Sequence, residues 1–197
     1  MQIKTLVSDL FEENTYIIAN NGTAVVIDPG ASILELQSMI ASLKSSVKYT
    51  LLTHGHYDHI ISALALGAPV YAHENEKIML EDPNINLSAH IINPRLSLKN
   101  VNYYKGKSYK MDEFEIYHTP GHTAGSVVIK TGNDLFTGDT LFLDSVGRTD
   151  TPTGDPKALK ASLKIFDGFD REIMCYPGHG DQFKLGDAYG ANFFLKK

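Results

Sequence analysis

The chain has 197 residues, a length that suits one large folded domain with a sizeable buried core. Hydrophobic residues make up 43% of it and charged residues 21%, which is typical of globular proteins. The formal net charge is −5 and no dense run of Lys and Arg occurs, which argues against nucleic acid or an anionic membrane surface as a partner.

Three further observations bear on the cellular compartment. No stretch approaches the roughly 20 apolar residues of a membrane span, and the first residues lack the apolar stretch of a signal peptide. Cys175 is the single cysteine, so an intramolecular disulfide is impossible and nothing requires an oxidising compartment. We therefore expect a cytoplasmic protein with no membrane partner.

Short β-rich runs alternate with helical patterns along the chain. The predicted strands cover residues 15–19, 23–27, 49–53, 70–72, 114–118, 126–130, 134–136 and 173–176. The predicted helices cover residues 32–43, 58–66, 74–81 and 157–166. This order predicts an α/β fold with two sheets and helices on their outer faces. No linker, repeat or low-complexity segment interrupts the chain, so we predict a single domain, residues 1–197.

The segment His54-Gly-His56-Tyr-Asp58-His59 is the strongest functional signal in the sequence. It places three imidazoles and a carboxylate within six positions, directly after a predicted strand. Scattered His and Asp residues are ordinary on a protein surface, but this clustering is typical of metal ligands.

Three more candidate ligands also follow predicted strands. They are His122, Asp139 and His179. Ligands at the ends of several strands are what a site at one rim of a β-scaffold needs. Glycines beside them permit unusual backbone angles and close approach to a metal ion.

Seven candidate ligands are too many for one tetrahedral ion, so the sequence predicts two divalent metal ions. One division assigns His54, His56 and His122 to the first ion, and Asp58, His59 and His179 to the second, with Asp139 as a bridging carboxylate. We expect zinc, with iron or manganese as alternatives. Two ions about 3.5–4 Å apart would lower the pKa of a bridging water and supply a hydroxide nucleophile.

The ligand series resembles that of the metallo-β-lactamase superfamily along essentially the whole chain. The shared features are His54-x-His56-x-Asp58-His59, the later His122, Asp139 and His179, and the early Ile-Asp28-Pro-Gly turn. The resemblance implies a four-layer αβ/βα sandwich with two mixed sheets, and a metal site at one edge between them. It also implies that Asp28 supports the ligand loop rather than binding metal; the alternative is an ordinary Asp-Pro-Gly turn residue.

Within the superfamily, the segments around Asp139, Arg148 and His179 look like those of the glyoxalase II-like (hydroxyacylglutathione hydrolase-like) branch, which hydrolyses thioesters such as S-lactoylglutathione to a thiol and a 2-hydroxy acid. The chain ends soon after His179 and has Asp150 where that branch has a tyrosine for the thiol carrier. It is therefore similar to the short single-domain subgroup, which leaves the carrier thiol open. We expect a small-molecule thioester as substrate, and Asp58 as both a ligand and the carboxylate that orients the hydroxide. The oligomeric state is not predicted.

Arg148 has two interpretations, recognition of a substrate carboxylate or a salt bridge to Asp150. An alternative function also remains, because persulfide dioxygenases are similar in the same motifs. Those enzymes use one Fe(II), which here would be held by His54, His122 and Asp139. In contrast, β-lactam hydrolysis is disfavoured, because a β-lactamase of this fold usually has a cysteine ligand where Asp139 stands.

Overall fold

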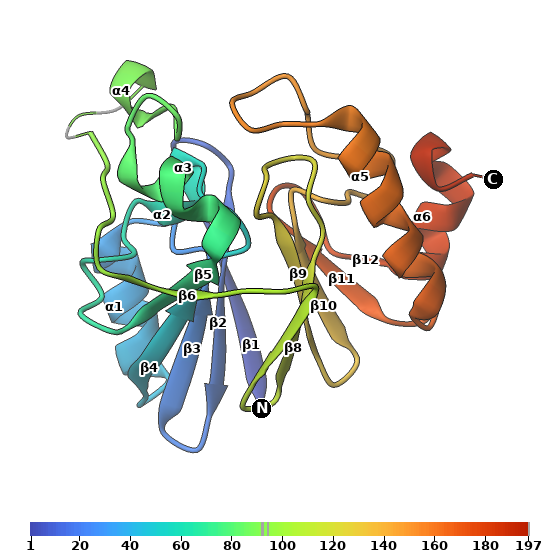
Figure 1. Ribbon diagram of the computed structural model, residues 1–197. Helices are drawn as coiled ribbons and strands as arrows, with labels where there is room; N and C mark the ends of the chain where they lie inside the picture. Colours follow the sequence, from blue (N-terminus) through green and yellow to red (C-terminus); the bar gives the residue numbers. More distant parts are fainter. Residues whose placement is uncertain (92, 94, 197) are drawn as a thin grey trace. The chain divides into compact units, whose positions relative to one another are not determined.

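The computed structural model describes residues 1–91, 93 and 95–196, and its chain divides into two compact units (Figure 1). The first unit comprises Met1–Ala72 and Lys77–Tyr103, and the second comprises His73–Glu76 and Tyr104–Lys197. Each unit is built on one mixed six-stranded sheet that carries helices. Within the described ranges, no helix is long and apolar enough to cross a membrane.

The first sheet has the strand order β1-β2-β3-β4-β5-β6. Strands β1 to β3 pair antiparallel, whereas β3, β4 and β5 run parallel to one another. Parallel neighbours end at the same edge of a sheet, so the segments that follow β3 and β4 emerge side by side. The strands are β1 (Gln2–Val7), β2 (Asn14–Asn20), β3 (Thr23–Ile27), β4 (Ser46–Leu51), β5 (Val70–His73) and β6 (Val101–Tyr104).

Helix α1 (Ile33–Ser42) covers the first sheet through an apolar face. Ser32 caps its N-terminus by accepting a hydrogen bond from the Glu35 amide, as Ser does at this position. Leu36 and Ile40, one turn apart, are buried against the side chains of β2 and β3. The other helices of this part of the chain are short: α2 (Tyr57–Ile60), the 3₁₀ turn η1 (Glu74–Glu76), α3 (Lys77–Glu81) and α4 (Ser88–Ile91).

The second sheet has the order β12-β11-β10-β9-β8-β7. Its strands pair antiparallel except for β10 and β11, which run parallel. Strands β8, β10 and β11 therefore all point in one direction and end at one edge. The strands are β7 (Ser108–Met111), β8 (Phe114–His118), β9 (Val127–Thr131), β10 (Asp134–Gly138), β11 (Met174–Pro177) and β12 (Phe183–Lys184).

The helices of the second unit pack on this sheet through a common apolar core. Leu163, Phe166 and Leu185 are buried there against β9, β10 and β11, and so is Cys175. Burial raises the pKa of the Cys175 thiol to about 12, which keeps it an unreactive core residue. The helical elements are α5 (Pro156–Ser162), η2 (Leu163–Gly168), α6 (Leu185–Ala191) and η3 (Phe193–Leu195).

The predicted fold class is confirmed, because the chain forms two mixed sheets with helices. Every predicted strand is present within a few residues of its expected bounds. The prediction of a helix over residues 58–66 was wrong in length, since α2 ends at Ile60. The Ser62 amide binds the Pro29 carbonyl and its hydroxyl binds the Ala31 carbonyl, so the neighbouring loop takes the place of the next helical turn.

Candidate metal centre

In the first unit, the candidate ligands lie in the segment that leaves β4 and enters α2. His54, His56 and His59 are buried, at most 6% exposed, whereas the Asp58 carboxylate is 15% exposed. The imidazole rings cluster, with the His54 centroid 4.9 Å from that of His56 and 4.1 Å from that of His59. The structure therefore gathers the four predicted ligands of this unit into one group.

Asp28 organises this group from the end of β3. Because β3 and β4 are parallel and Ile27 is in register with Leu51, Asp28 emerges beside Thr53. Its Oδ1 accepts the Thr53 amide (2.7 Å), and its Oδ2 accepts the Thr53 hydroxyl (2.5 Å). Oδ2 also lies 3.1 Å from His59 Nδ1. Both carboxylate oxygens are thus engaged, and the geometry agrees with the predicted supporting role.

These bonds assign the tautomers of two histidines. A carboxylate only accepts, so His59 must donate its Nδ1–H to Asp28. The Thr53 hydroxyl donates to Asp28, so it accepts from His54 Nδ1 at 3.1 Å. Each imidazole therefore keeps Nε2 as its lone-pair nitrogen, the atom that binds a metal. His59 Nε2 lies 3.9 Å from Asp58 Oδ2.

Glu13 belongs to the same group and was missed by the sequence analysis. Its side chain is fully buried, accepts the Thr15 hydroxyl at 3.1 Å and lies 3.9 Å from His59 Nδ1. Burial raises the pKa of Glu13 well above its usual range, and the nearby Asp28 adds to the effect. Gly30 permits this packing, because a Cβ there would lie 1.8 Å from the Asp58 carbonyl oxygen and 2.2 Å from Glu13 Oε2. No motif spacing marks Glu13; a glutamate at the start of an apolar strand is the only signal.

In the second unit, His122, Asp139 and His179 follow β8, β10 and β11 at the common edge of the sheet. Gly138 is in register with Pro177, and the Gly178 amide binds the Gly138 carbonyl, which places Asp139 beside His179. The His122 side chain is 3% exposed, that of Asp139 is 13% exposed and that of His179 is 31% exposed. The structure therefore brings together the three predicted ligands of this unit.

Asp139 is spaced from His122, and separately from His179, as two ligands of one cation would be. Asp139 Oδ2 lies 3.5 Å from His122 Nε2 and 3.8 Å from His179 Nε2. These distances exceed those of good hydrogen bonds. Two ligands each about 2.1 Å from a tetrahedral ion would be about 3.4 Å apart. One carboxylate oxygen between two imidazole nitrogens is thus the arrangement expected of metal ligands.

The loop of residues 146–149 holds His122 in place. His122 Nδ1 donates to the Arg148 carbonyl (2.8 Å), which again leaves Nε2 as the candidate ligand nitrogen. Gly147 lies directly against the ring, since a Cβ there would be 2.7 Å from His122 Nδ1 and 2.0 Å from the Asp139 carbonyl oxygen. Only glycine fits between these two candidate ligands.

The Arg148 guanidinium forms the salt bridge to Asp150 that was the second of its two predicted interactions. Nε and a terminal nitrogen bind the two Asp150 oxygens at 2.7 and 3.0 Å. Both side chains are exposed, and such a pair contributes little to stability. The structure thus pairs Arg148 with Asp150, and its assignment to substrate remains a prediction.

The other histidines lie outside both groups of candidate ligands. His73 and His118 stack on each other, with centroids 3.9 Å apart, and His73 Nε2 lies 3.2 Å from the Gly106 carbonyl oxygen. Burial and the neighbouring His118 lower the pKa of His73. His90 lies on α4 with an exposed side chain.

Comparison with known proteins identifies the relatives of this chain. A sequence profile described as the metallo-beta-lactamase superfamily matches residues 9–179. Hydroxyacylglutathione hydrolase GloC of Haemophilus influenzae is 31% identical, over 99% of this chain and 98% of that protein. The crystal structure of BLEG-1 B3 metallo-beta-lactamase is 31% identical, with a TM-score of 0.88 and full coverage of both chains. The crystal structure of TTHA1623 in a di-iron-bound form is 33% identical, with a TM-score of 0.86 over 99% of this chain and 100% of that one.

Proposed function

Because this chain belongs to the metallo-β-lactamase superfamily, we propose that it is a binuclear metal-dependent hydrolase that cleaves a thioester such as S-lactoylglutathione to a thiol and a 2-hydroxy acid. The observation that carries the proposal is the position of Asp139 Oδ2, 3.5 and 3.8 Å from two imidazole Nε2 atoms. The similarity to a hydroxyacylglutathione hydrolase supports the choice of substrate class.

The proposed ligands are the seven predicted from the sequence. One ion would be held by His54, His56 and His122, the other by Asp58, His59 and His179, and Asp139 would bridge them. The similarity to a protein that holds two irons supports a binuclear centre and keeps iron beside zinc as a candidate metal. When bound, such ions lower the pKa of water to yield a hydroxide near neutral pH and polarise a carbonyl.

The chain's own residues prepare that chemistry. Asp28 fixes His59 directly, and His54 through Thr53, with Nε2 as the ligand atom in each. The Arg148 carbonyl does the same for His122. Asp58 would orient the attacking water and accept its proton. Water adds to the acyl carbon, the C–S bond breaks, and the thiolate leaves with its electron pair.

The test is thiol release from S-D-lactoylglutathione by the metal-replete protein. We expect kcat/KM of at least about 10⁴ M⁻¹s⁻¹, with Asp139→Ala losing most of this activity and the exposed His90→Ala retaining it. Nitrocefin serves as a second substrate, because of the similarity to BLEG-1. Absence of thiol release from several thioesters, together with turnover of nitrocefin, would refute the proposal.

A mononuclear iron dioxygenase acting on persulfides is the second candidate. The di-iron neighbour supports iron as the metal, although its two ions favour the binuclear centre. The single Fe(II) of this second candidate would be held by His54, His122 and Asp139. Oxygen uptake with glutathione persulfide, at one iron per chain, would support this function over hydrolysis. We expect no uptake and two metal ions per chain.

A further inference from the structure

The 3₁₀ turn η1 carries a buried glutamate that the proposed chemistry does not use. Glu76 is 1% exposed, and the segment His73–Glu76 belongs to the second compact unit. A buried carboxyl group loses its hydration, so its oxygens need hydrogen-bond donors from the protein. The donors that Glu76 binds therefore indicate what its side chain does.

These donors lie in the loop that carries His122. Glu76 Oε1 accepts the Thr123 hydroxyl at 2.5 Å and the Gly125 amide at 2.7 Å. Thr123 follows His122 directly in the chain, and both residues are buried. One carboxyl oxygen thus holds the loop at the position after the candidate ligand, and again two residues further on.

The Thr123 hydroxyl joins Glu76 to the loop's own hydrogen bonds. Because this hydroxyl donates its single proton to Glu76, it accepts the proton of the Ser126 hydroxyl, whose oxygen lies 2.6 Å away. The Ser126 oxygen in turn accepts the Thr123 amide at 3.0 Å. Hydrogen bonds in such a chain polarise and strengthen one another, so loss of the Glu76 oxygen would weaken several contacts of the loop at once.

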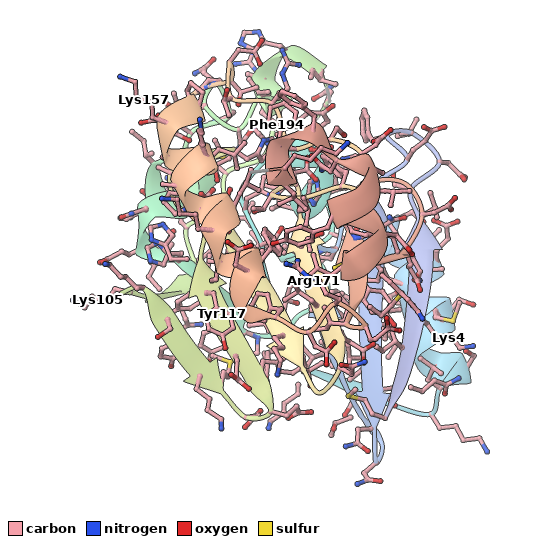
Figure 2. The ribbon with its side chains drawn as sticks, turned by 90° about the vertical axis from the view of Figure 1, so that its right-hand side faces the viewer. Lys4, Lys105, Tyr117, Lys157, Arg171 and Phe194 are labelled. Carbon is pink, nitrogen blue, oxygen red and sulfur yellow. The ribbon has the colours of Figure 1, made fainter. Side chains whose placement is uncertain are left out.

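Glu76 also packs closely against the loop. A Cβ at Gly125 would lie 2.7 Å from the Glu76 backbone nitrogen and 2.8 Å from Oε1, both closer than real Cβ atoms approach, so only glycine leaves room here. Near its other end, the loop is tied to the start of α5, because the Gly121 carbonyl accepts the Asp155 amide at 2.8 Å. Figure 2 marks β8, which leads into this loop, by Tyr117, and the start of α5 by Lys157.

Glu76 and the Arg148 carbonyl fix different features of His122. The carbonyl accepts from Nδ1, which sets the tautomer and the rotation of the ring. Glu76 binds the residues that follow, which sets the backbone from which the ring extends. A shift of this backbone would change the 3.5 Å separation of His122 Nε2 from Asp139 Oδ2. Metal–ligand distances tolerate deviations of only about 0.2 Å, so such a shift would weaken the site.

From these observations we propose that Glu76 is a positioning residue of the metal centre, which holds the His122 loop so that Nε2 lies where a metal ion can bind it. Glu76 acts through Thr123 and Gly125 and does not itself bind the ion. The inference rests on the proposed role of His122 as a ligand, and it does not depend on which substrate the centre hydrolyses.

The test is titration of the metal-free protein with cobalt(II), followed by visible absorption, and competition with a chelator for zinc. Glu76→Ala should weaken binding of the ion that His122 holds by about tenfold, the lower end of the loss expected when the support of a ligand is removed. It should also change the visible absorption of the bound cobalt, because this absorption depends on the coordination geometry. Glu76→Gln should stay within about threefold of the unmodified protein, because its amide oxygen can accept the same two hydrogen bonds.

Two control variants separate positioning from a general loss of stability. Glu74→Ala removes an exposed carboxylate from the same turn, and Phe166→Leu removes volume from the buried core of the second unit. Both should keep the cobalt affinity and absorption of the unmodified protein, although Phe166→Leu should lower Tm. Gly125→Ala, which forces Glu76 away from the loop, should reproduce the weaker binding of Glu76→Ala.

Cobalt affinity and absorption of Glu76→Ala equal to those of Glu74→Ala would overturn the inference, and so would an equal loss of affinity in Phe166→Leu. Binding as weak in Glu76→Gln as in Glu76→Ala would overturn the role of the oxygen as an acceptor.

His122→Ala reports on the proposed metal centre separately. Unchanged cobalt binding in this variant would refute His122 as a ligand, and the inference with it. Weakened binding in His122→Ala, together with unchanged binding in Glu76→Ala, would overturn the role of Glu76 alone. Thiol release from S-D-lactoylglutathione by the unmodified protein tests the thioesterase function independently of both variants.

Discussion

Replacing Asp28 by asparagine should weaken metal binding without unfolding the protein. Oδ1 can still accept the Thr53 amide, but an Nδ2 amide group would replace Oδ2, which accepts from the Thr53 hydroxyl and His59 Nδ1. The Thr53 hydroxyl can rotate and accept a hydrogen bond from the new amide group. The His59 Nδ1–H, however, would face another donor, so the tautomer with the proton on Nε2, which cannot bind a metal, becomes favoured.

The expected magnitude follows from these contacts. Loss of a partner that orients a ligating histidine typically costs about 10–100-fold in metal affinity, or about 1.4–2.7 kcal/mol. The lost charge-assisted bonds should also lower the free energy of unfolding by roughly 1–3 kcal/mol. For a chain of this size that corresponds to a fall in Tm of roughly 2–12 °C.

The assay is a competitive chelator titration with zinc, paired with thermal unfolding of the metal-free protein. Asp82→Asn is the matched control, because among the described residues Asp82 Oδ1 accepts hydrogen bonds only from Asn84, in an exposed turn, and an amide oxygen can replace it. It should change stability by less than about 0.5 kcal/mol. Zinc affinity of Asp28→Asn within twofold of the unmodified protein would refute the argument that Asp28 fixes the ligand tautomers.

Three further changes test other parts of the structure. Burial raises the pKa of Glu13 in the folded state, so the unfolded chain loses this proton at a lower pH than the folded protein does. The stability of the metal-free protein should therefore fall as pH rises above the unfolded pKa. Glu13→Gln should reduce the difference in the free energy of unfolding between about pH 5 and pH 8, measured by urea titration. An unchanged difference would contradict a raised pKa for Glu13. Gly147→Ala forces a Cβ to 2.0 Å from the Asp139 carbonyl oxygen and should lower the free energy of unfolding by about 1–3 kcal/mol. The control Gly168→Ala, which has open space around it, should lower it by less than about 1 kcal/mol. Equal losses in the two variants would count against a tight fit at Gly147. Asp155→Ala removes the two amide bonds that cap α5 and should lower the free energy of unfolding by about 0.5–2 kcal/mol, measured in urea; a neutral result would mean that the cap is dispensable.

The sequence was informative wherever local chemistry decides structure. Strands such as β3 and β8 were predicted at their observed bounds, because β-branched and aromatic runs between turn residues favour extended backbone. The helix predicted from residue 157 is likewise observed, and Asp155 caps it with proline at the next position. The candidate ligands could be named for the same reason, since residue type and spacing alone mark a His- and Asp-rich loop.

Elements with weak local signals were missed. The strands β1, β6, β7 and β12 have no counterpart in the prediction. Strand β7 has mostly exposed residues, and β12 is only two residues long, so neither shows an apolar periodicity. Their pairing partners along the sheet hold them in place.

What the sequence determined by itself was the chemistry of the ligands and their place after strands; the tertiary structure decided how each one is oriented. Asp28 reaches His59 across 31 positions, and the Arg148 carbonyl reaches His122 across 26, so both bonds depend on which strands are neighbours and in which register. The position of the buried Glu13, 3.9 Å from His59 Nδ1, depends on packing in the same way. Contacts between residues far apart in the chain form only once the sheets have assembled, and no local pattern encodes them.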